Sequence, residues 1–292
     1  MRPETVRKAV LRWAEMLDRP LPWRGERDPY RVLVSEVMLQ QTQAARVAKD
    51  YETFLARFPT VDALAAADPA AVLRAWGNLG YNRRALNLWR AAATIADRGW
   101  PRTIDGLREL PGIGPYTARA VASFAFDAEA GVVDANVRRV LSRVHGLAPD
   151  EDVQALADAL VPPGTAPRWN QAMIDLGAVV CRARDPQCAG CPIRSGCAWT
   201  SGRRPASKRA ARPAPRFETT MRYARGRIVS VLRSRRWTTL RSLVRYSGLE
   251  AGRASAAVDA LEADGVINRR GERIYLGPGA AISRATEASE RR

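Results

Sequence analysis

Residues 110–118 read Leu-Pro-Gly-Ile-Gly-Pro-Tyr-Thr-Ala, and this stretch gives the clearest indication of the local fold. Gly112 and Gly114 flank one apolar residue, and glycines permit a tight turn and a close approach of the backbone to a ligand. Pro115 is suited to the first position of a helix, whose N-terminus offers free N–H groups to an anion. The stretch therefore predicts a turn between two helices that can bind a phosphate. Taken alone, however, a Gly-X-Gly pattern is more often just a turn.

Helices are expected on both sides of this turn. Through most of residues 1–200, apolar residues return every three or four positions, and Pro and Gly separate the runs. No convincing series of alternating strands occurs there, so these residues are expected to form one mainly α domain. The expected helices are one that opens at Pro29 and carries Leu33, Val37 and Val47, and others over residues 61–76, 82–96 and 135–144.

The last third of the chain has a different composition. Residues 201–221 are rich in Arg, Pro, Ala and Ser and predict a basic linker. Residues 222–278 resemble a small winged-helix-like α+β domain, and residues 279–292 are expected to be a disordered tail. The third helix of such a domain commonly enters the major groove of DNA, although a packing or protein-docking role also fits. Its helices are expected over residues 225–232, 240–246 and 253–263, and its strands at 266–267 and 273–276.

The charge of this 292-residue, 32.1 kDa chain indicates a polyanionic partner. Lys and Arg number 47 against 30 Asp and Glu, and residues 201–292 hold 21 basic and 8 acidic residues. Basic side chains neutralise phosphates and release counterions, so the C-terminal third is expected to contact nucleic acid. No apolar run of about 18 residues occurs, and the N-terminus lacks the apolar segment of a secretory signal. A cytoplasmic protein without a membrane partner is expected.

All four cysteines lie within 17 residues, at Cys181, Cys188, Cys191 and Cys197. Structural disulfides are unusual in the cytoplasm, whereas four thiolates in one short segment can bind a tetrahedral metal ion or an iron–sulfur cluster. The spacing Cys-X6-Cys-X2-Cys-X5-Cys does not by itself distinguish zinc from iron. The pattern therefore predicts a metal-binding or cluster-binding loop over residues 181–197.

Two acidic residues are candidates for chemistry. Asp134 follows Gly131-Val132-Val133 and precedes a predicted helix, so it is suited to cap that helix. A carboxylate held by backbone N–H groups stays ionised and can face a cationic sugar. Glu36 lies in an otherwise apolar helical stretch, where an unpartnered carboxylate is costly. We therefore expect Glu36 either to be paired or to be held protonated for acid chemistry.

Together these motifs resemble the endonuclease III and MutY branch of the helix-hairpin-helix DNA glycosylases. The resemblance rests on four stretches in chain order: SEVMLQQTQ at 35–43 after LPWR at 21–24, LPGIGPYTA at 110–118, GVVDANVRR at 131–139, and the cysteine pattern. It implies a mainly α helix-hairpin-helix glycosylase domain over residues 1–200 and a 4Fe–4S cluster on the four cysteines. It also implies that Arg182 and Arg184 of the cluster loop contact DNA.

The resemblance implies roles for single residues as well. Glu36 matches the glutamate that protonates adenine at N7, Asp134 the aspartate that stabilises the cationic sugar, and Asn136 an asparagine that supports this aspartate. Tyr116 stands where endonuclease III has its Schiff-base lysine, so AP lyase activity is expected to be weak or absent. Further residues are implied in DNA binding, namely Gln41, Tyr81, Asn82, Gly112 and Gly114, and in the base pocket, namely Trp23, Arg24 and Leu39.

Two features depart from the MutY pattern. The family's Gly-Leu-Gly-Tyr-Tyr loop reads Asn-Leu-Gly-Tyr-Asn at residues 78–82, which replaces the tyrosine that inserts beside 8-oxoguanine. The usual C-terminal Nudix-like domain, which inspects 8-oxoguanine, is replaced by the winged-helix-like pattern. Both departures concern recognition of the base opposite the target, which the sequence leaves open.

The sequence thus predicts a monofunctional DNA glycosylase of base excision repair, which hydrolyses the N-glycosidic bond of a flipped, mispaired base. Adenine opposite 8-oxoguanine or guanine is the favoured target. One alternative on the same scaffold removes uracil, thymine or a modified pyrimidine opposite guanine, and an alternative of another class is a non-catalytic DNA-binding regulator. The expected partner is double-stranded DNA with a mispaired or damaged base, and a monomer associated with the bacterial nucleoid is expected.

Overall fold

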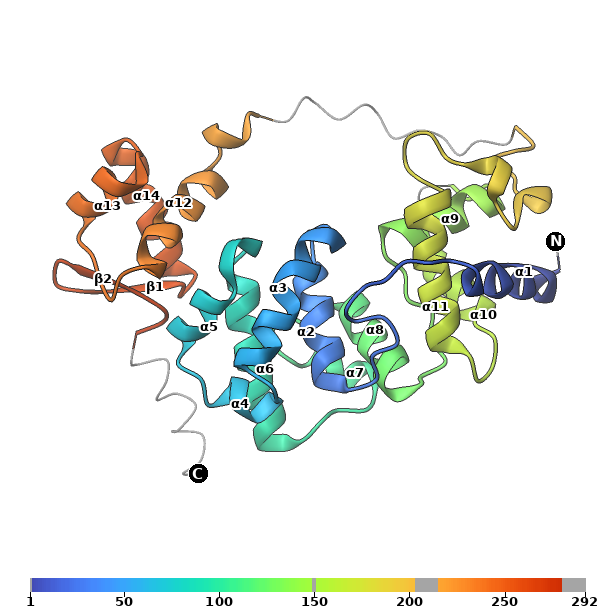
Figure 1. Ribbon diagram of the computed structural model, residues 1–292, viewed down its shortest axis with the longest axis horizontal. Coiled ribbons are helices and arrows are strands. Elements are labelled where there is room, and N and C mark those ends of the chain that lie inside the picture. Colours follow the sequence, from blue (N-terminus) through green and yellow to red (C-terminus); the bar gives the residue numbers. More distant parts are fainter. Residues whose placement is uncertain (1, 149–150, 203–214, 280–292) are drawn as a thin grey trace. The chain divides into compact units, whose positions relative to one another are not determined.

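The computed structural model describes residues 2–148, 151–202 and 215–279, and these are mainly helical (Figure 1). The chain forms two compact units, each built from two separate stretches of sequence. Unit 1 comprises residues 1–36 and 101–210, and unit 2 comprises residues 37–100 and 211–292. The first division falls within one helix, α2 (Pro29–Leu39). Among the described residues, no helix has both the length and the apolar character that a membrane span requires.

Unit 1 packs its helices around one apolar core. Its elements are α1 (Pro3–Glu15), α7 (Ile104–Arg108), α8 (Pro115–Phe126), α9 (Ala135–His145), α10 (Val153–Leu160), α11 (Ala166–Asp175), the π-helical turn η2 (Leu176–Val180), and the short turns η3 (Cys188–Gly190) and η4 (Arg194–Gly196). α11 packs against α1, α8 and α9 (Figure 1). The buried side chains of Val140, Trp169, Met173 and Leu176 belong to the core that these helices enclose. α11 is thus the central element of this unit.

The first part of unit 2 is also helical. Its elements are α3 (Ala44–Arg57), α4 (Val61–Ala65), α5 (Pro69–Ala75), the short turn η1 (Gly77–Leu79) and α6 (Arg83–Arg98). Trp76 is fully buried, and its ring meets that of Phe54 edge to face at 5.9 Å between centroids. α6 packs on both α4 and α5. Trp76 also donates from Nε1 to the Gly80 carbonyl at 2.9 Å, so the aromatic core contacts the loop that joins α5 to α6.

The C-terminal part of unit 2 follows the order of three helices and a hairpin. Its elements are the short turn η5 (Phe217–Thr219), α12 (Met221–Arg233), α13 (Leu240–Ser247), α14 (Ala251–Ala263), β1 (Ile267–Arg270) and β2 (Arg273–Leu276). The strands pair antiparallel, with Ile267 opposite Leu276. Thr238, just before α13, forms an isolated antiparallel bridge with Ile274 of β2. This order confirms the expected small α+β region, and the winged-helix assignment itself stays a prediction.

Two expected helices are broken in the structure. The prediction of a single helix from Pro29 through Val47 is wrong. The chain forms α2 and α3 separately, because Gln41 between them has a left-handed backbone with φ 54°. Residues 61–76 form two helices rather than one. Asp68 accepts a hydrogen bond as the N-cap of α5, and Pro69 has no N–H with which to continue α4.

The other expectations for the helices are confirmed. The segments expected over 82–96 and 135–144 correspond to α6 and α9, and the described part of residues 2–202 contains no β-strand. Most of the expected basic linker (201–221) and nearly all of the expected tail (279–292) lie outside the described residues, at 203–214 and 280–292.

Candidate active site

The glycine turn that precedes α8 has the expected geometry. Gly112 has φ 77°, a left-handed conformation that favours glycine, and Gly114 is the N-cap of α8 with Pro115 in the first turn. Tyr116, the next residue, projects from this helix toward α2, where its hydroxyl hydrogen-bonds to the Glu36 carboxyl. The turn therefore both exposes a helix N-terminus and places a phenol beside a buried acid.

α2 buries Glu36 among apolar side chains. The residue is 5% exposed, and its helix also carries the fully buried Leu33 and Val34. Oε2 of Glu36 has no hydrogen-bond partner among the described residues. The pKa of Glu36 is raised to about 7. Burial is the largest cause, the hydrogen bond from Tyr116 acts in the opposite direction, and the nearby charge of Asp134 adds to the increase. Glu36 is thus a carboxylic acid that keeps its proton well above the usual range and is about half protonated at pH 7.

A cavity of about 390 Å³ opens at Glu36. Its wall combines the aromatic rings of Trp23 and Phe124 with the polar side chains of Arg24, Gln171 and Glu36. Such a mixture of flat apolar walls and a few polar groups suits a planar heterocycle. Two of the residues expected in a base pocket, Trp23 and Arg24, therefore line the same cavity as the acid. Leu39, the third, is the last residue of α2.

Behind the cavity, a second buried carboxylate is fully paired. Asp175, at the end of α11, has no exposed surface. Its Oδ1 accepts from Arg19 Nη1 at 2.5 Å and its Oδ2 from Arg24 Nη2 at 2.6 Å. The two cations hold the segment before α2 against α11. Sequence reasoning missed this triad because the partners lie 151 and 156 residues apart and no local pattern links them.

Asp134 caps α9, as expected. Its Oδ1 accepts from the backbone N–H of Val137 at 2.7 Å, and its Oδ2 accepts from Asn136 Nδ2 at 2.7 Å. The two hydrogen bonds hold the carboxylate in one orientation at the N-terminus of α9. The structure therefore places an acid with a raised pKa, Glu36, near an oriented carboxylate, Asp134, in one unit.

Arg139 orients the Asn136 amide. Its Nη2 donates to Asn136 Oδ1 at 2.8 Å, its Nε donates to the Cys181 carbonyl at 2.6 Å, and Nη2 also reaches the Gly177 carbonyl at 2.7 Å. Because the amide oxygen accepts from a cation, the amide nitrogen must face Asp134. Sequence reasoning missed Arg139, although its position three residues after Asn136 on a predicted helix was the available signal.

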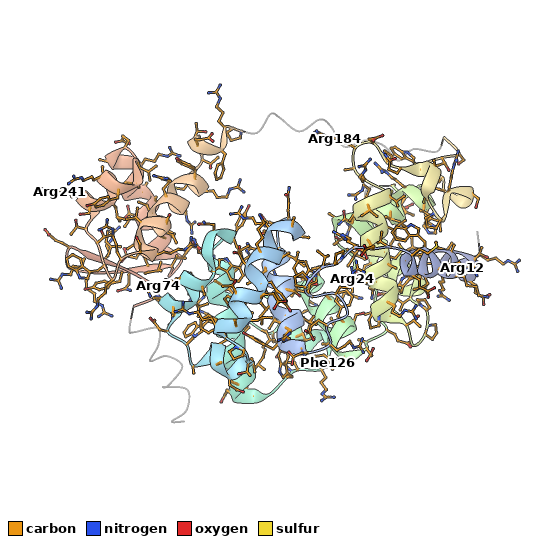
Figure 2. The ribbon with its side chains drawn as sticks, viewed as in Figure 1. Arg12, Arg24, Arg74, Phe126, Arg184 and Arg241 are labelled. Carbon is orange, nitrogen blue, oxygen red and sulfur yellow. The ribbon has the colours of Figure 1, made fainter. Side chains whose placement is uncertain are left out.

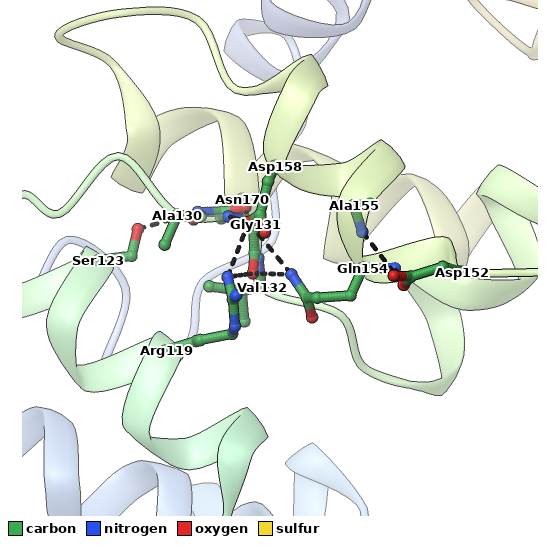
Figure 3. A network of polar contacts seen from close by, with 10 residues as sticks. All are labelled: Arg119, Ser123, Ala130, Gly131, Val132, Asp152, Gln154, Ala155, Asp158 and Asn170. Carbon is green, nitrogen blue, oxygen red and sulfur yellow. Dashed lines mark hydrogen bonds and ion pairs between the residues drawn. The ribbon is translucent and has the colours of Figure 1, made fainter. Parts of the chain in front are cut away.

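Figure 3 shows what holds the segment that leads into Asp134. Asn170 is buried on α11, and it accepts from Val132 N–H at 3.0 Å while donating to the Ala130 carbonyl at 2.8 Å. Asp158 accepts from Gly131 N–H at 2.7 Å and pairs with Arg119. A Cβ at Gly131 would lie 2.7 Å from the backbone of Ala157, so glycine is required there. The extended segment is thereby fixed by its neighbours on α8, α10 and α11.

The four cysteines line the same pocket. Cys181, Cys188, Cys191 and Cys197 line one largely apolar pocket together with Ile193 and Trp199. The described residues contain no group of three His, Cys, Asp or Glu side chains arranged to hold a single metal ion. Four sulfur donors around one pocket nevertheless fit the ligand chemistry of a 4Fe–4S cluster.

Arginines support and surround this pocket. Arg143 is buried, stacks on Trp199 at 4.4 Å and donates to the carbonyls of Arg182 at 2.7 Å and Ala183 at 3.1 Å. Arg182 is exposed but already paired with Asp185 at 3.1 Å. Arg184 is exposed at the surface of the same loop and is labelled in Figure 2. Of the two arginines expected to contact DNA, Arg184 is therefore the more available.

In unit 2, one arginine ties two loops together. Gln41 and Tyr81 both have left-handed backbones, with φ 54° and 48°. Arg84, on α6, donates to the Met38 and Gln40 carbonyls before Gln41, to the Thr42 hydroxyl after it and to the Gly80 carbonyl. Its guanidinium also stacks on the Tyr81 ring at 5.3 Å. Burial lowers the pKa of Arg84 to about 10, so it remains a cation at neutral pH. Arg84 thus holds the loops of Gln41 and Tyr81, two of the residues expected to bind DNA.

The C-terminal region contacts the same loop. Arg233 of α12 donates to Asn82 Oδ1 at 2.9 Å and to Asn78 Oδ1 at 3.2 Å, and Arg222 donates to the Tyr81 hydroxyl at 2.5 Å. Asn82, which departs from the family pattern, is therefore an acceptor for an arginine of this chain. Sequence reasoning did not predict this pairing, because it joins segments about 150 residues apart.

The fold and this site define a class of protein. Residues 34–163 match the model of the HhH-GPD superfamily of base excision DNA repair proteins. A thermostable thymine-DNA glycosylase superposes with a TM-score of 0.64 at 29% identity, covering 68% of this chain and 97% of that one. Endonuclease III trapped covalently on DNA gives a TM-score of 0.59 at 27% identity, covering 70% and 99%. The class is that of the helix-hairpin-helix base excision repair proteins.

Sequence relatives narrow the class. The adenine DNA glycosylase of Mycolicibacterium smegmatis is 44% identical, over 89% of this chain and 92% of its own length. That of Mycobacterium tuberculosis is 41% identical over 92% of each chain. The human adenine DNA glycosylase is 40% identical over 65% of this chain and 38% of its own length. The chain belongs to the adenine DNA glycosylase family, which confirms the predicted resemblance to MutY. Because the mycobacterial matches cover about nine tenths of this chain, they include residues of the C-terminal region beyond residue 202.

Proposed function

We propose that this protein is a monofunctional DNA glycosylase that removes adenine opposite 8-oxoguanine or guanine. The observation that carries the proposal is Glu36, a carboxylic acid with a pKa raised to about 7 at the cavity whose wall includes Trp23. Enzymes tune a glutamate to such values when it serves as a general acid near neutral pH. Family membership supports adenine as the base it serves.

In the proposed reaction, the target nucleotide leaves the duplex and its base enters the cavity. Glu36 donates its proton to N7 of the adenine, so the base departs as a neutral leaving group when the N-glycosidic bond breaks. The Asp134 carboxylate, oriented by Asn136 and Val137, stabilises the cationic sugar that remains. Water then adds to the sugar carbon and loses a proton, which completes hydrolysis.

Tyr116 explains why the proposed reaction has no covalent enzyme–sugar step. Tyr116 occupies the site of the Schiff-base lysine in endonuclease III, and burial raises the pKa of its phenol well above the usual range. A neutral phenol does not form an imine with a sugar aldehyde. Its hydroxyl instead hydrogen-bonds to Glu36. We therefore propose that AP lyase activity is weak or absent.

We propose that Cys181, Cys188, Cys191 and Cys197 hold a 4Fe–4S cluster. The support is their convergence on one apolar pocket and the backbone contacts of Arg143 that shape the loop. Bound there, the cluster would crosslink residues 181–197 and stabilise the loop. Absorbance near 400 nm in the purified protein tests this proposal, and a colourless protein with stoichiometric zinc would contradict it.

DNA contacts follow from the exposed turns. The N–H groups at Gly112 and Gly114 are proposed to bind a phosphate, and Arg184 another. Gln41, Tyr81 and Asn82 are proposed to contact the opened base stack, since their loops are fixed by Arg84. The protein is proposed to act as a monomer on double-stranded DNA, as part of base excision repair in the bacterial nucleoid.

A second candidate on the same scaffold removes uracil, thymine or a modified pyrimidine opposite guanine. Two observations favour it: the thymine-DNA glycosylase is a close structural match, and Asn82 replaces the tyrosine of the MutY loop. Glu36 at the cavity favours adenine instead, because protonation at N7 requires a purine. A non-catalytic DNA-binding regulator would need neither Glu36 protonated nor Asp134 oriented.

A panel of duplexes tests these proposals. Single-turnover excision is measured on adenine, thymine, uracil and hydroxymethylated bases, each opposite guanine or 8-oxoguanine, with alkaline cleavage to reveal abasic sites. We expect adenine release, and strand cleavage that depends on added alkali. Release of a pyrimidine with adenine left intact would support the second candidate. Tight binding without release of any base would support the regulator.

A further inference from the structure

The third helix of the C-terminal region is poorly suited to bind DNA. Residues 250–264, which include α14, contain one arginine and four acidic residues. That arginine, Arg253, is committed to the protein, because its Nη2 donates to the carbonyls of Glu218 and Thr220 at 2.5 and 2.8 Å. Asp259 and Glu262 are paired with Arg269 of β1. α14 thus presents acidic side chains and no available cation, contrary to the expectation that it enters the major groove.

The second helix and its surroundings have the opposite character. Residues 234–249 contain four arginines and no acidic residue. Arg241 and Arg245 are exposed and lie one turn apart on α13, so they project from the same side of the helix. None of the four forms an ion pair within the part of the chain that the structure describes. Figure 2 labels Arg241 at the outer surface of this region.

Exposed aromatic rings position neighbouring arginines. Arg235 lies 4.0 Å from the centroid of the Tyr246 ring, and Arg273 of β2 lies 4.4 Å from that of Trp237. Tyr246 is 47% and Trp237 40% exposed, although burying large aromatic rings is normally favourable. A guanidinium that stacks on a ring loses little conformational freedom when its N–H groups bind an anion, because its plane is already held.

We infer that these residues form the DNA-binding surface of the C-terminal region. The α13 face consists of Arg235, Trp237, Arg241, Arg245, Tyr246 and Arg273. Its partner is the phosphate backbone of duplex DNA, because the face offers several unpaired, partly immobilised guanidinium groups and little else that would read base edges. α14 instead packs against α12 and β1 as a structural helix. The inference rests on the proposed DNA glycosylase function for the choice of partner.

Two charge-matched variants of the full-length protein test the assignment. Arg241→Ala with Arg245→Ala removes two positive charges from the α13 face. Ala251→Glu with Ala256→Glu adds two negative charges at exposed positions of α14, so the net charge changes equally. Binding to a lesion-free 20-base-pair duplex is followed by fluorescence anisotropy from about 50 to 200 mM salt, and thermal melts establish that both variants fold. A lesion-free probe makes the result independent of base excision.

The α13 variant is expected to bind about tenfold more weakly at low salt. The plot of log K against log salt has a negative slope, and its magnitude should decrease by about 2 because two phosphate contacts are lost. The α14 variant should keep a slope within about half a unit of the wild type. An unchanged slope in the folded α13 variant, or a larger loss in the α14 variant, would overturn the assignment. If the proposed glycosylase activity were wrong, no base would be excised from the panel of duplexes, while the salt slopes of the two variants would still differ as predicted.

Discussion

Glu36 and Asp175 are buried carboxylates in the same unit, yet their surroundings differ completely. Asp175 has two arginine partners, at 2.5 and 2.6 Å, and both of its oxygens accept hydrogen bonds. Glu36 has no cation, one hydrogen bond from the Tyr116 phenol, and an oxygen without a partner among the described residues. One carboxylate is therefore paired with two arginines and stabilises the fold, whereas the other has a pKa raised to about 7. Burial therefore raises the pKa of a carboxyl group strongly only where no cation is paired with it.

This difference also explains why the protein tolerates an unsatisfied group at Glu36. A buried carboxylate without a cation is costly, and proteins keep such groups where the shifted pKa is useful. Asp175 sits behind the cavity wall and holds Arg24, whose side chain lines the same cavity. The paired carboxylate thus shapes the cavity, and the unpaired one supplies its chemistry.

The largest effect is expected on replacing Glu36. Glu36→Gln keeps the size of the side chain but removes the transferable proton, so single-turnover excision of adenine should fall by about 10² to 10⁴-fold. DNA affinity should change little, because Glu36 is buried. The measurement is quenched single-turnover kinetics at saturating enzyme, and a rate within threefold of the wild type would contradict the assignment.

The matched change in the paired carboxylate should act on folding instead. Asp175→Asn leaves Arg19 and Arg24 without an anion and should lower the free energy of unfolding by about 3 kcal/mol. Chemical denaturation measures this loss. If the folded fraction of this variant were as inactive as Glu36→Gln, the two carboxylates would not have separate roles.

The raised pKa of Glu36 also predicts how stability changes with pH. The folded-state pKa of Glu36, about 7, lies above the ordinary value of a glutamate, so the stability it confers is present at low pH and is lost as pH rises to about 7. Glu36→Gln has no such loss. Its free energy of unfolding relative to wild type should therefore increase by up to about 3 kcal/mol between pH 5 and pH 8. Denaturation at both pH values measures the difference, and a constant offset would refute the raised pKa.

A smaller effect is expected for the buried cation of unit 2. Arg84→Lys keeps the charge but cannot reach both the Gln40 carbonyl and the Gly80 carbonyl, so the loops at Gln41 and Tyr81 should lose their fixed geometry. We expect about tenfold slower excision with little change in overall stability. Arg83→Lys on the same helix, whose side chain is 67% exposed, is the matched control and should be close to wild type.

Several features of the site were predictable from short motifs, because each depends on the chemistry of residues that are close in sequence. The glycine turn at 112–114, the cap at Asp134 and the buried acid at Glu36 each depend on a few neighbouring residues. The break after α2 was missed because the left-handed backbone of Gln41 is held by Arg84, which is distant in sequence. The Asp175 triad and the Arg233 contacts could not be predicted, since they join segments about 150 residues apart.

The role of Glu36 as the proton donor is tested by the pH dependence of single-turnover adenine excision by wild type and Glu36→Gln. If Glu36 is the general acid, the wild-type rate should be level at low pH and fall about tenfold per pH unit above about 7, where Glu36 loses its proton. The variant should be slow and show no such decline. A wild-type rate that stays constant from pH 5 to pH 9, or a variant that retains the decline, would contradict the assignment of Glu36 as the proton donor.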